Sequence, residues 1–343
     1  MFEQLLGQDN IKRTLSEAAA GGKVGHAYVF CGPEGIGRKS FAREFARGVM
    51  CTGGNFGGSV PCGQCTSCLL MAAWTNPDFK LIRGEENRAT IGVETGRGIE
   101  EDIATAPTVS AKKVYVIDRS EKLTVQAQNA LLKTIEEPPE YVMLVLICSN
   151  PALLIDTVRS RVTRLDFARY SREEVLTAYR GDGTGGELSP EDEEFVVSYA
   201  DGIIGRGLQF KDFELYGALR EKIFDALLLL KKSAASFFTE FTGLFTDKGN
   251  AEKKEFMFFE LTSIVRDAMI FARTKDGEAL QNRQFRNKIE ELAGIAGRHG
   301  WEKILDAVTE AYRLTGQNVN YRMIIVNLAA EMREAAQSKQ EKL

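Results

Sequence analysis

The sequence predicts an α/β protein in which a parallel sheet is followed by an all-helical region. In the first half of the 343 residues, short apolar runs of the kind that form buried strands alternate with segments of helical periodicity. After about residue 170 the strand pattern does not return, and amphipathic helical segments follow one another along the chain. These two observations separate a sheet-containing half from a helical half.

The strands and helices of the first half can be placed in order. Strands are expected at 27–31, 78–82, 113–118, 141–148 and, as a shorter one, 162–167. Helices are expected between them at 11–20, 39–50, 98–105 and 125–135. Strands that alternate with helices form βαβ units, in which the strands run parallel. The first half is therefore expected to form one doubly wound sheet.

The second half is expected to be helical throughout. One helix is expected at 171–179, where Ser171 and Glu174 form a capping box, and another begins at Ser189–Pro190. Longer amphipathic segments are expected at 219–241, 253–273, 301–314 and 321–337. The chain thus divides into three predicted domains, an α/β domain at 1–168, a small helical domain at 169–209 and an all-helical domain at 210–343.

Charge and hydropathy exclude several classes of protein. The formal net charge of −4 argues against a chain that binds nucleic acid by bulk electrostatics. No apolar leader opens the sequence, and it has no run of about 18 apolar residues. We therefore expect a soluble, cytoplasmic protein whose contacts with nucleic acid are local or shared with partners.

Four cysteines form the most specific metal-binding pattern in the chain. Ten residues separate Cys51 from Cys62, and two residues separate Cys62 from Cys65 and Cys65 from Cys68. This spacing allows four thiolates to meet at one tetrahedral point, for which zinc is the expected ion. Four sulfur ligands leave no open coordination position, so the predicted site is structural. Free or redox-active thiols are the alternative.

A glycine-rich turn follows the first expected strand and opens the next helix, which is the context of a phosphate-binding loop. Gly32, Gly35 and Gly37 would let backbone N–H groups approach phosphate oxygens. In a working loop the next two residues are Lys and then Ser or Thr, whereas here they are Arg38 and Lys39.

These replacements change the chemistry of the loop. Arginine is a bulkier, forked donor that does not substitute for lysine in a tight cradle, and an ammonium group cannot ligate Mg²⁺. A shift of one residue would align Lys39 and Ser40 with the motif but would lengthen the loop. Three states of the site stay open, namely an empty loop, bound ATP or ADP that is not hydrolysed, and a working site.

The strand expected at 113–118 carries a second departure from a hydrolytic site. It ends in Asp118, a position that can orient magnesium, although a solvated aspartate is the alternative. A glutamate in the next position would polarise the attacking water, but that residue is Arg119, which cannot act as a general base. The two motifs together predict a loop that does not hydrolyse nucleotide.

The chain resembles the bacterial AAA+ clamp-loader subunits of DNA polymerase III, and among them most closely the delta-prime branch. The resemblance rests on residues 26–30, the four-cysteine insertion, residues 127–139, Ser149 at the first sensor position, and Ser160–Arg161–Val162. It spans residues 1 to about 168, while the helical remainder matches in length and class only. It implies an AAA+ RecA-like sheet domain with a zinc insertion, a helical lid and a C-terminal helical collar for assembly.

The same resemblance implies a role for Arg161. In this family the arginine reaches into a neighbouring subunit's ATP site and stabilises charge on the transferred phosphoryl group. A surface ion pair of Arg161 with Asp156 or Asp166 is the alternative.

The implied function is that of a non-hydrolysing clamp-loader subunit of the DNA polymerase III holoenzyme, which helps place the sliding clamp on primed DNA. Its implied partners are the gamma/tau and delta subunits, the beta clamp and primer–template DNA. Motor subunits of the gamma/tau type keep the Lys and Thr of the loop, so this chain departs from their pattern. An ATP-hydrolysing gamma/tau-type motor and a free-standing zinc-stabilised interaction module are the alternatives.

Overall fold

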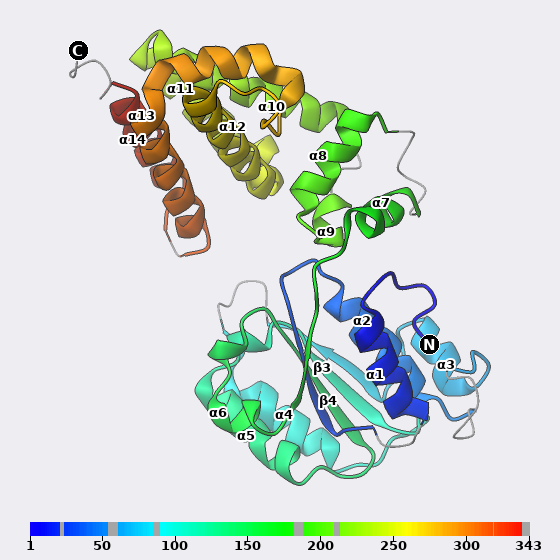
Figure 1. Cartoon of the computed structure of the whole chain (residues 1–343). Helices are drawn as coiled ribbons and strands as arrows, with labels where there is room; N and C mark the ends of the chain where they lie inside the picture. The colour runs from blue at the N-terminus through cyan, green and yellow to red at the C-terminus, as the bar shows by residue number, and fades with distance from the viewer. Residues whose placement is uncertain are drawn as a thin grey trace. The chain divides into compact units, whose positions relative to one another are not determined.

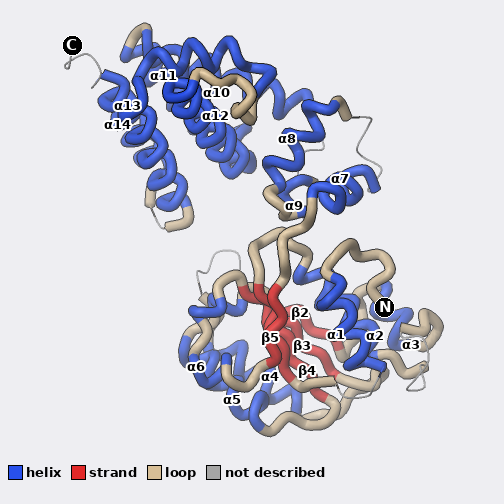
Figure 2. Tube along the Cα trace, in the orientation of Figure 1, coloured by secondary structure: helices blue, strands red, loops and turns tan. Residues whose placement is uncertain are grey.

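The computed structural model describes residues 1–20, 24–53, 61–84, 90–181, 188–208, 213–317 and 319–337 (Figure 1). The chain forms two compact units. The first consists of Met1–Gly186 and Ala200–Gln209, and the second of Glu187–Tyr199 and Phe210–Leu343. In the described residues, all strands belong to the first unit (Figure 2).

The first unit is built on a parallel sheet with the strand order β2-β3-β4-β1-β5. The strands are β1 (Ala27–Cys31), β2 (Phe79–Ile82), β3 (Lys113–Ile117), β4 (Val142–Cys148) and β5 (Thr163–Asp166). β1, β3 and β4 are buried along their whole length. Central strands covered on both faces explain the continuous apolar runs in the sequence. The predicted α/β class with a parallel sheet is confirmed.

Helices cover both faces of this sheet (Figure 1). α1 (Asp9–Ala20) and α2 (Arg38–Met50) lie on one face, and α4 (Val93–Ile103), α5 (Val125–Glu136) and α6 (Asp156–Arg159) lie on the other. α3 (Thr66–Ala72), α7 (Arg172–Gly181) and α9 (Ile204–Gly207) are further helices of this unit. Between the sheet and α4–α5 lies an apolar core that includes Val29, Leu144, Ile99 and Leu131.

The start of α4 differs from the prediction. The helix begins at Val93 rather than at Gly98, because two glycines in this stretch, Gly96 and Gly98, lower its helix propensity. Gly96 is buried where α4 approaches α5, and a Cβ atom at this position would lie 2.9 Å from the Cβ of Ala130. Close packing of the two helices therefore favours the glycine that the sequence pattern counts against a helix.

The second unit is an all-helical assembly, which confirms the predicted class of the C-terminal region. Its helices are α8 (Pro190–Ala200), α10 (Phe213–Leu228), α11 (Ala234–Thr246), α12 (Lys254–Thr274), α13 (Arg286–Thr315) and α14 (Tyr321–Gln337). The single helix expected at 219–241 is wrong, because α10 ends at Leu228 and Ser233 caps the start of α11. α13 begins earlier than expected and bends at Gly297, whose φ is 63°.

The predicted three-domain boundaries stay a prediction. Within the described chain, α7 and α9 group with the sheet, whereas nearly all of α8 groups with the C-terminal helices. None of the described helices combines the length and the apolar character that crossing a membrane requires.

Candidate functional site

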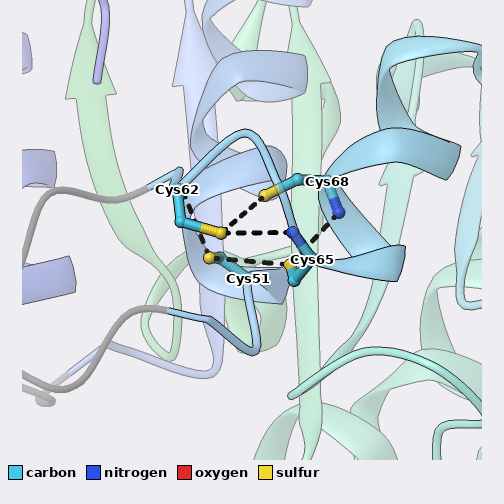
Figure 3. A group of neighbouring side chains, drawn as sticks. All are labelled: Cys51, Cys62, Cys65 and Cys68. Atoms are coloured by element: carbon cyan, nitrogen blue, oxygen red, sulfur yellow. Dashed lines mark hydrogen bonds between the residues drawn. The ribbon is translucent and has the colours of Figure 1, made fainter.

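The four predicted metal ligands converge at one point (Figure 3). The Sγ atoms of Cys51, Cys62, Cys65 and Cys68 all lie within 4.8 Å of one another. The Sγ atoms of Cys51 and Cys65 are 3.9 Å apart, and those of Cys62 and Cys68 are 4.0 Å apart. A tetrahedral zinc ion with Zn–S distances of ~2.3 Å places its sulfur ligands ~3.8 Å apart. The arrangement therefore fits zinc.

Backbone groups orient these thiols. The N–H of Cys62 points at the Sγ of Cys51 at 3.4 Å, and the N–H groups of Cys65 and Cys68 make equivalent contacts of 3.4 Å with Cys62 and Cys65. Such donors stabilise thiolate charge, which a metal requires of its ligands. Cys51 directly follows α2, and Cys65 caps α3, so the site joins the ends of two helices. Residues 54–60, between the first two ligands, lie outside the described residues.

A buried polar network anchors α3 to the sheet. Ser67 of α3 contacts Ser110 through their hydroxyls at 2.9 Å, and the amide of Asn76 donates to both hydroxyls. Asp78, which is 3% exposed, accepts hydrogen bonds of 2.7–2.9 Å from the backbone N–H groups of residues 108–110. This carboxylate fixes the loop that precedes β3.

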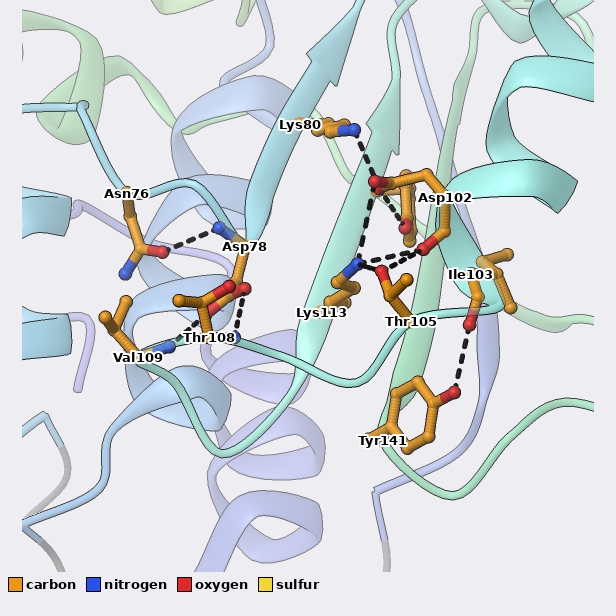
Figure 4. Close-up of polar contacts among 11 residues, drawn as sticks. Asn76, Asp78, Lys80, Asp102, Ile103, Thr105, Thr108, Val109, Lys113 and Tyr141 are labelled. Carbon is orange, nitrogen blue, oxygen red and sulfur yellow. Dashed lines mark hydrogen bonds and ion pairs between the residues drawn. The ribbon is translucent and has the colours of Figure 1, made fainter.

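A second network surrounds Asp102 at the end of α4 (Figure 4). Its carboxylate lies 2.7 Å from the Nζ atom of Lys80 and accepts from the hydroxyl of Tyr115 at 2.6 Å. Burial alone would raise the pKa of Asp102, but these donors hold it below its usual value. Lys113 donates to the backbone carbonyl of the same aspartate at 2.8 Å. Both networks serve to hold the sheet and its helices in place.

The glycine-rich loop lies between β1 and α2, as the sequence predicts. Gly35 and Gly37 have φ values of 86° and 100°, which favour glycine. The carbonyl of Gly35 accepts a hydrogen bond of 3.0 Å from the N–H of Gly205 at the start of α9. A Cβ atom on Gly205 would come within 2.8 Å of the Gly35 backbone, and the Tyr170 hydroxyl donates to the carbonyl of Ile36.

The two unusual residues of the loop have different surroundings. Arg38 is 7% exposed, its Nη1 atom has no hydrogen-bond partner in the described chain, and burial lowers the pKa of its guanidinium group. Lys39 places its Nζ atom 2.5 Å from the Oδ2 atom of Asp118. The ammonium of Lys39 thus contacts the carboxylate that would orient magnesium in a working site. Ser40 is exposed at the start of the helix.

Two residues after β3 form an ion pair and a hydrogen bond near the loop. Arg119, which follows Asp118, pairs with Glu34 of the loop itself. Glu121 accepts a hydrogen bond from the hydroxyl of Ser149, the predicted sensor residue. The structure therefore brings together the loop, Asp118 and the end of β4. The sequence did not predict the ion pairs Lys39–Asp118 and Arg119–Glu34. The available signal was a basic residue at each of two unusual positions: Lys39 in place of Ser or Thr, and Arg119 in place of Glu.

The four cysteines and the loop lie at opposite ends of α2. This helix has 13 residues, which corresponds to a length of ~20 Å. Cys51 follows its last residue, and the glycine-rich loop precedes its first. The cysteine cluster is therefore separate from any ligand that the loop would hold.

Arg161 lies on the surface after α6. Its Nε atom is 2.7 Å from the Oε1 atom of Glu136, and its Nη1 atom donates to the Thr157 carbonyl at 3.0 Å. The partners considered for it from sequence, Asp156 and Asp166, pair instead with Arg159 and Arg164, respectively. The sequence did not predict Glu136 as the partner of Arg161, because Glu136 lies at the end of α5, far from Arg161 in the sequence. The available signal was its position in the Glu-Glu-Pro-Pro run that ends this helix.

Comparisons with known proteins point to one family. Residues 7–171 match the family model described as DNA polymerase III, delta subunit. The chain is 33% identical over 231 residues to the DNA polymerase III subunit tau of Bacillus subtilis (strain 168), covering 66% of this chain and 40% of that protein. It is 35% identical over 136 residues to the DNA polymerase III subunit delta' of Pseudomonas aeruginosa PAO1, covering 40% of this chain and 41% of that protein.

The matched segments span about two fifths of each of these relatives. Among solved structures, a DNA polymerase III gamma subunit-related protein of Thermotoga maritima aligns with 96% of this chain and 99% of its own, with a TM-score of 0.47 and 17% identity. The family model and the named relatives agree with the motifs of the sheet unit. The chain belongs to the clamp-loader family of DNA polymerase III subunits.

Proposed function

We propose that this chain is a delta-prime-type clamp-loader subunit that helps place the sliding clamp on primed DNA and does not hydrolyse ATP. The ion pair between Lys39 and Asp118 carries this proposal. A hydrolytic site needs the aspartate for magnesium and an acidic neighbour for water, whereas here a lysine covers the aspartate and Arg119 follows it. The loop therefore lacks the groups for phosphoryl transfer.

Arg161 supports a second part of the proposal, in which this subunit completes the ATP site of a neighbour. Its side chain is 41% exposed and its only ion-pair partner in the described chain is Glu136. Arginine fingers supplied in trans raise phosphoryl-transfer rates by about 10³ to 10⁵. A subunit whose own loop does not hydrolyse ATP would still need this residue.

The four cysteines would hold a structural zinc ion. Four thiolates close the coordination sphere, so the ion would stabilise the α2–α3 segment rather than activate water. The redox-thiol alternative would leave the four sulfur atoms without a common partner.

The remaining parts of the proposal follow from membership of the family. The gamma/tau and delta subunits, the beta clamp and primer–template DNA would be its partners, and the cytoplasm its location. The helical unit would serve as the collar through which a hetero-oligomer assembles. These roles match the delta' name of the Pseudomonas relative.

ATP turnover by a reconstituted clamp-loader complex tests the arginine role. Arg161→Ala in this subunit is expected to lower DNA- and clamp-stimulated turnover by at least about tenfold, and Arg161→Lys to restore little of it. Arg159→Ala, two residues away and paired with Asp156, is the matched control and should leave turnover unchanged. A complex with Arg161→Ala that turns over normally would exclude the trans-acting role.

The competing function is an ATP-hydrolysing motor subunit of the gamma/tau type. The match to the Bacillus subtilis tau subunit over 231 residues favours it, because that match is longer than the match to delta'. Steady-state ATP hydrolysis by the isolated chain decides between the two. Hydrolysis that disappears in an Asp118→Asn variant would establish the motor function, and an inert chain supports the delta-prime type.

A further inference from the structure

We propose that a cavity in the helical unit is a binding site for an alkylguanidinium group, which either a small molecule or an arginine side chain of another protein would supply. The cavity has a volume of about 750 Å³ and is lined by residues of α8, α10, α12 and the segment 278–284, which follows α12. Ligand sites have volumes of about 300–1,000 Å³. The lining residues all belong to the second unit. The inference goes beyond the proposed function, which assigns no ligand to this unit.

The first supporting observation is an unpaired carboxylate oxygen in the lining of the cavity. Glu260 of α12 lines the cavity and is 0% exposed, and its Oε1 atom has no hydrogen-bond partner in the described residues. The Oε2 atom lies 3.0 Å from the Nε atom of Arg220, which also lines the cavity. A buried acceptor without a donor is unfavourable, so a ligand that donates to Oε1 would bind with a gain.

The second observation is that the buried charges beside the cavity do not balance. Asp267 is also 0% exposed, and N–H groups of Gln281 and Asn282 donate to it at 2.8–3.1 Å. Burial raises the pKa of Glu260 to about 7, and the charge of Asp267 contributes to the shift. Within the described chain, one guanidinium, that of Arg220, thus serves two buried carboxylates. A second cation would balance the cluster.

The third observation is that Arg220 is held where it is. Its guanidinium carbon lies 4.4 Å from the centre of the Phe195 ring, and its Nη2 atom donates to the side-chain oxygen of Asn282. Asn282 in turn donates to the hydroxyl of Ser263 at 2.9 Å. Arg220 would have to leave these partners to reach the second oxygen of Glu260. A ligand therefore meets a preformed site, which lowers the free-energy cost of binding.

The remaining lining favours a guanidinium on an alkyl chain. The lining carries three carboxylates and two guanidinium groups; these belong to Glu194, Glu260 and Glu278, and to Arg220 and Arg283. A guanidinium is less strongly hydrated than an ammonium, so it loses less free energy in a buried site. Its five N–H donors can bond other oxygens of the lining besides Glu260. Phe259 offers the alkyl chain an apolar contact in the same cavity.

The test is calorimetric titration of the full-length chain at pH 8 with butylguanidinium and, separately, with a capped Gly-Arg-Gly peptide. Wild-type protein is expected to bind at least one of them with a dissociation constant below about 1 mM. Butylurea has nearly the same shape as butylguanidinium but no charge, and it should bind at least about tenfold more weakly. Glu260→Gln keeps the shape of the side chain and removes its charge, so it should weaken binding at least about tenfold. Glu221→Gln, exposed on α10 and outside the cavity lining, is the matched control and should leave affinity unchanged.

The pH dependence of binding gives an independent readout. Butylguanidinium stays charged between pH 6 and pH 8, whereas Glu260, whose pKa burial raises to about 7, loses its proton over this range. A cation binds the ionised carboxylate, so the dissociation constant should fall by about three- to tenfold from pH 6 to pH 8. The charged groups around Glu260 are Arg220 of α10, Asp267 of α12, Glu194 of α8, and Glu278 and Arg283 of the segment that follows α12. If Glu260→Gln fails to fold by circular dichroism, this change in affinity decides the question alone.

The ligand arms identify the source of the guanidinium. Binding of butylguanidinium but not the peptide assigns a small molecule, and binding of the peptide assigns an arginine side chain of another protein; either supports the proposal. The proposal is overturned if wild-type protein binds neither ligand, binds butylurea equally tightly, or binds butylguanidinium equally at pH 6 and pH 8. A folded Glu260→Gln variant with wild-type affinity overturns it as well. These outcomes are distinct from failure of the proposed function, since the turnover experiment with Arg161→Ala does not depend on what this cavity binds.

Discussion

The carboxylate of Glu136 lies 2.7 Å from the guanidinium of Arg161, although Glu136 ends α5 and Arg161 lies in the turn after α6. Both side chains are exposed by more than two fifths, so water screens the pair and its contribution to folding stability is small. The pair instead fixes the direction in which the Arg161 side chain points. An arginine that reaches into a neighbouring subunit must leave or share Glu136.

Glu136→Gln should release Arg161 without unfolding the protein. Because an exposed ion pair is worth about 0–1 kcal/mol, turnover of the reconstituted complex is expected to rise by up to about fivefold or stay unchanged. Glu137→Gln, at the adjacent exposed position, is the control. A loss of turnover as large as that caused by Arg161→Ala would mean that Glu136 positions the arginine instead of restraining it.

The purified chain should contain one zinc ion, measured by elemental analysis, and Cys65→Ser should lose it. Loss of the ion should increase hydrogen exchange in the segment from Pro61 to Asn76, since metal binding supplies local folding free energy there. Cys31→Ala removes a buried cysteine outside the cluster and should keep the metal. A zinc-free chain with full protection of this segment would contradict a structural metal.

Asp78→Ala should destabilise the protein by about 3 kcal/mol in chemical denaturation. The substitution removes the acceptor of the N–H groups of residues 108–110, of which that of Ser110 is buried. Glu101→Ala, on the exposed side of α4, should change stability by less than about 0.5 kcal/mol. Equal effects of the two variants would show that water replaces the Asp78 carboxylate.

The helical unit should lose stability as pH rises toward neutrality because of Glu260. Complete burial raises the pKa of Glu260 to about 7, although Arg220, at 3.0 Å, opposes the shift. The native state then holds a proton that the unfolded state releases near the ordinary pKa of 4.5. Stability from this group is full below that value, falls by up to about 3 kcal/mol as pH approaches 7, and is constant above.

Denaturation followed by circular dichroism between about pH 5 and pH 8 measures this slope. Glu260→Gln should remove the component, while Glu221→Gln, exposed on α10, should keep it. A slope that persists in Glu260→Gln would assign the pH dependence to other groups.

The sequence predicted most of the sheet because its signal is local. β1 is found at the expected Ala27–Cys31, and α14 at the expected Tyr321–Gln337, since buried strands and amphipathic helices are encoded by neighbouring residues. The four cysteines were recognisable as a metal site because their spacing in the sequence is typical of four thiolates that bind one zinc ion. The break between α10 and α11 escaped, because apolar residues continue through it.

For the polar part of the candidate site, the sequence predicted which residues take part but not which side chains pair with one another. The loop and Asp118 carry motifs, but the ion pair of Lys39 with Asp118 joins two elements that are far apart in the sequence. The same holds for Arg161, whose partner is on α5 rather than among the nearby aspartates. Side-chain pairing between distant segments has no periodic signal, so the structure was needed to identify it.

The hydrogen bond between Gly35 and Gly205 couples the backbone conformation of the glycine-rich loop to the position of α9. A ligand that rotates the Gly35 peptide must also stretch or break the bond from the Gly205 N–H, because no side chain lies between the two backbones to absorb the movement. A ligand at the start of α2 that moves this peptide would therefore also move a helix far along the chain, through backbone atoms alone.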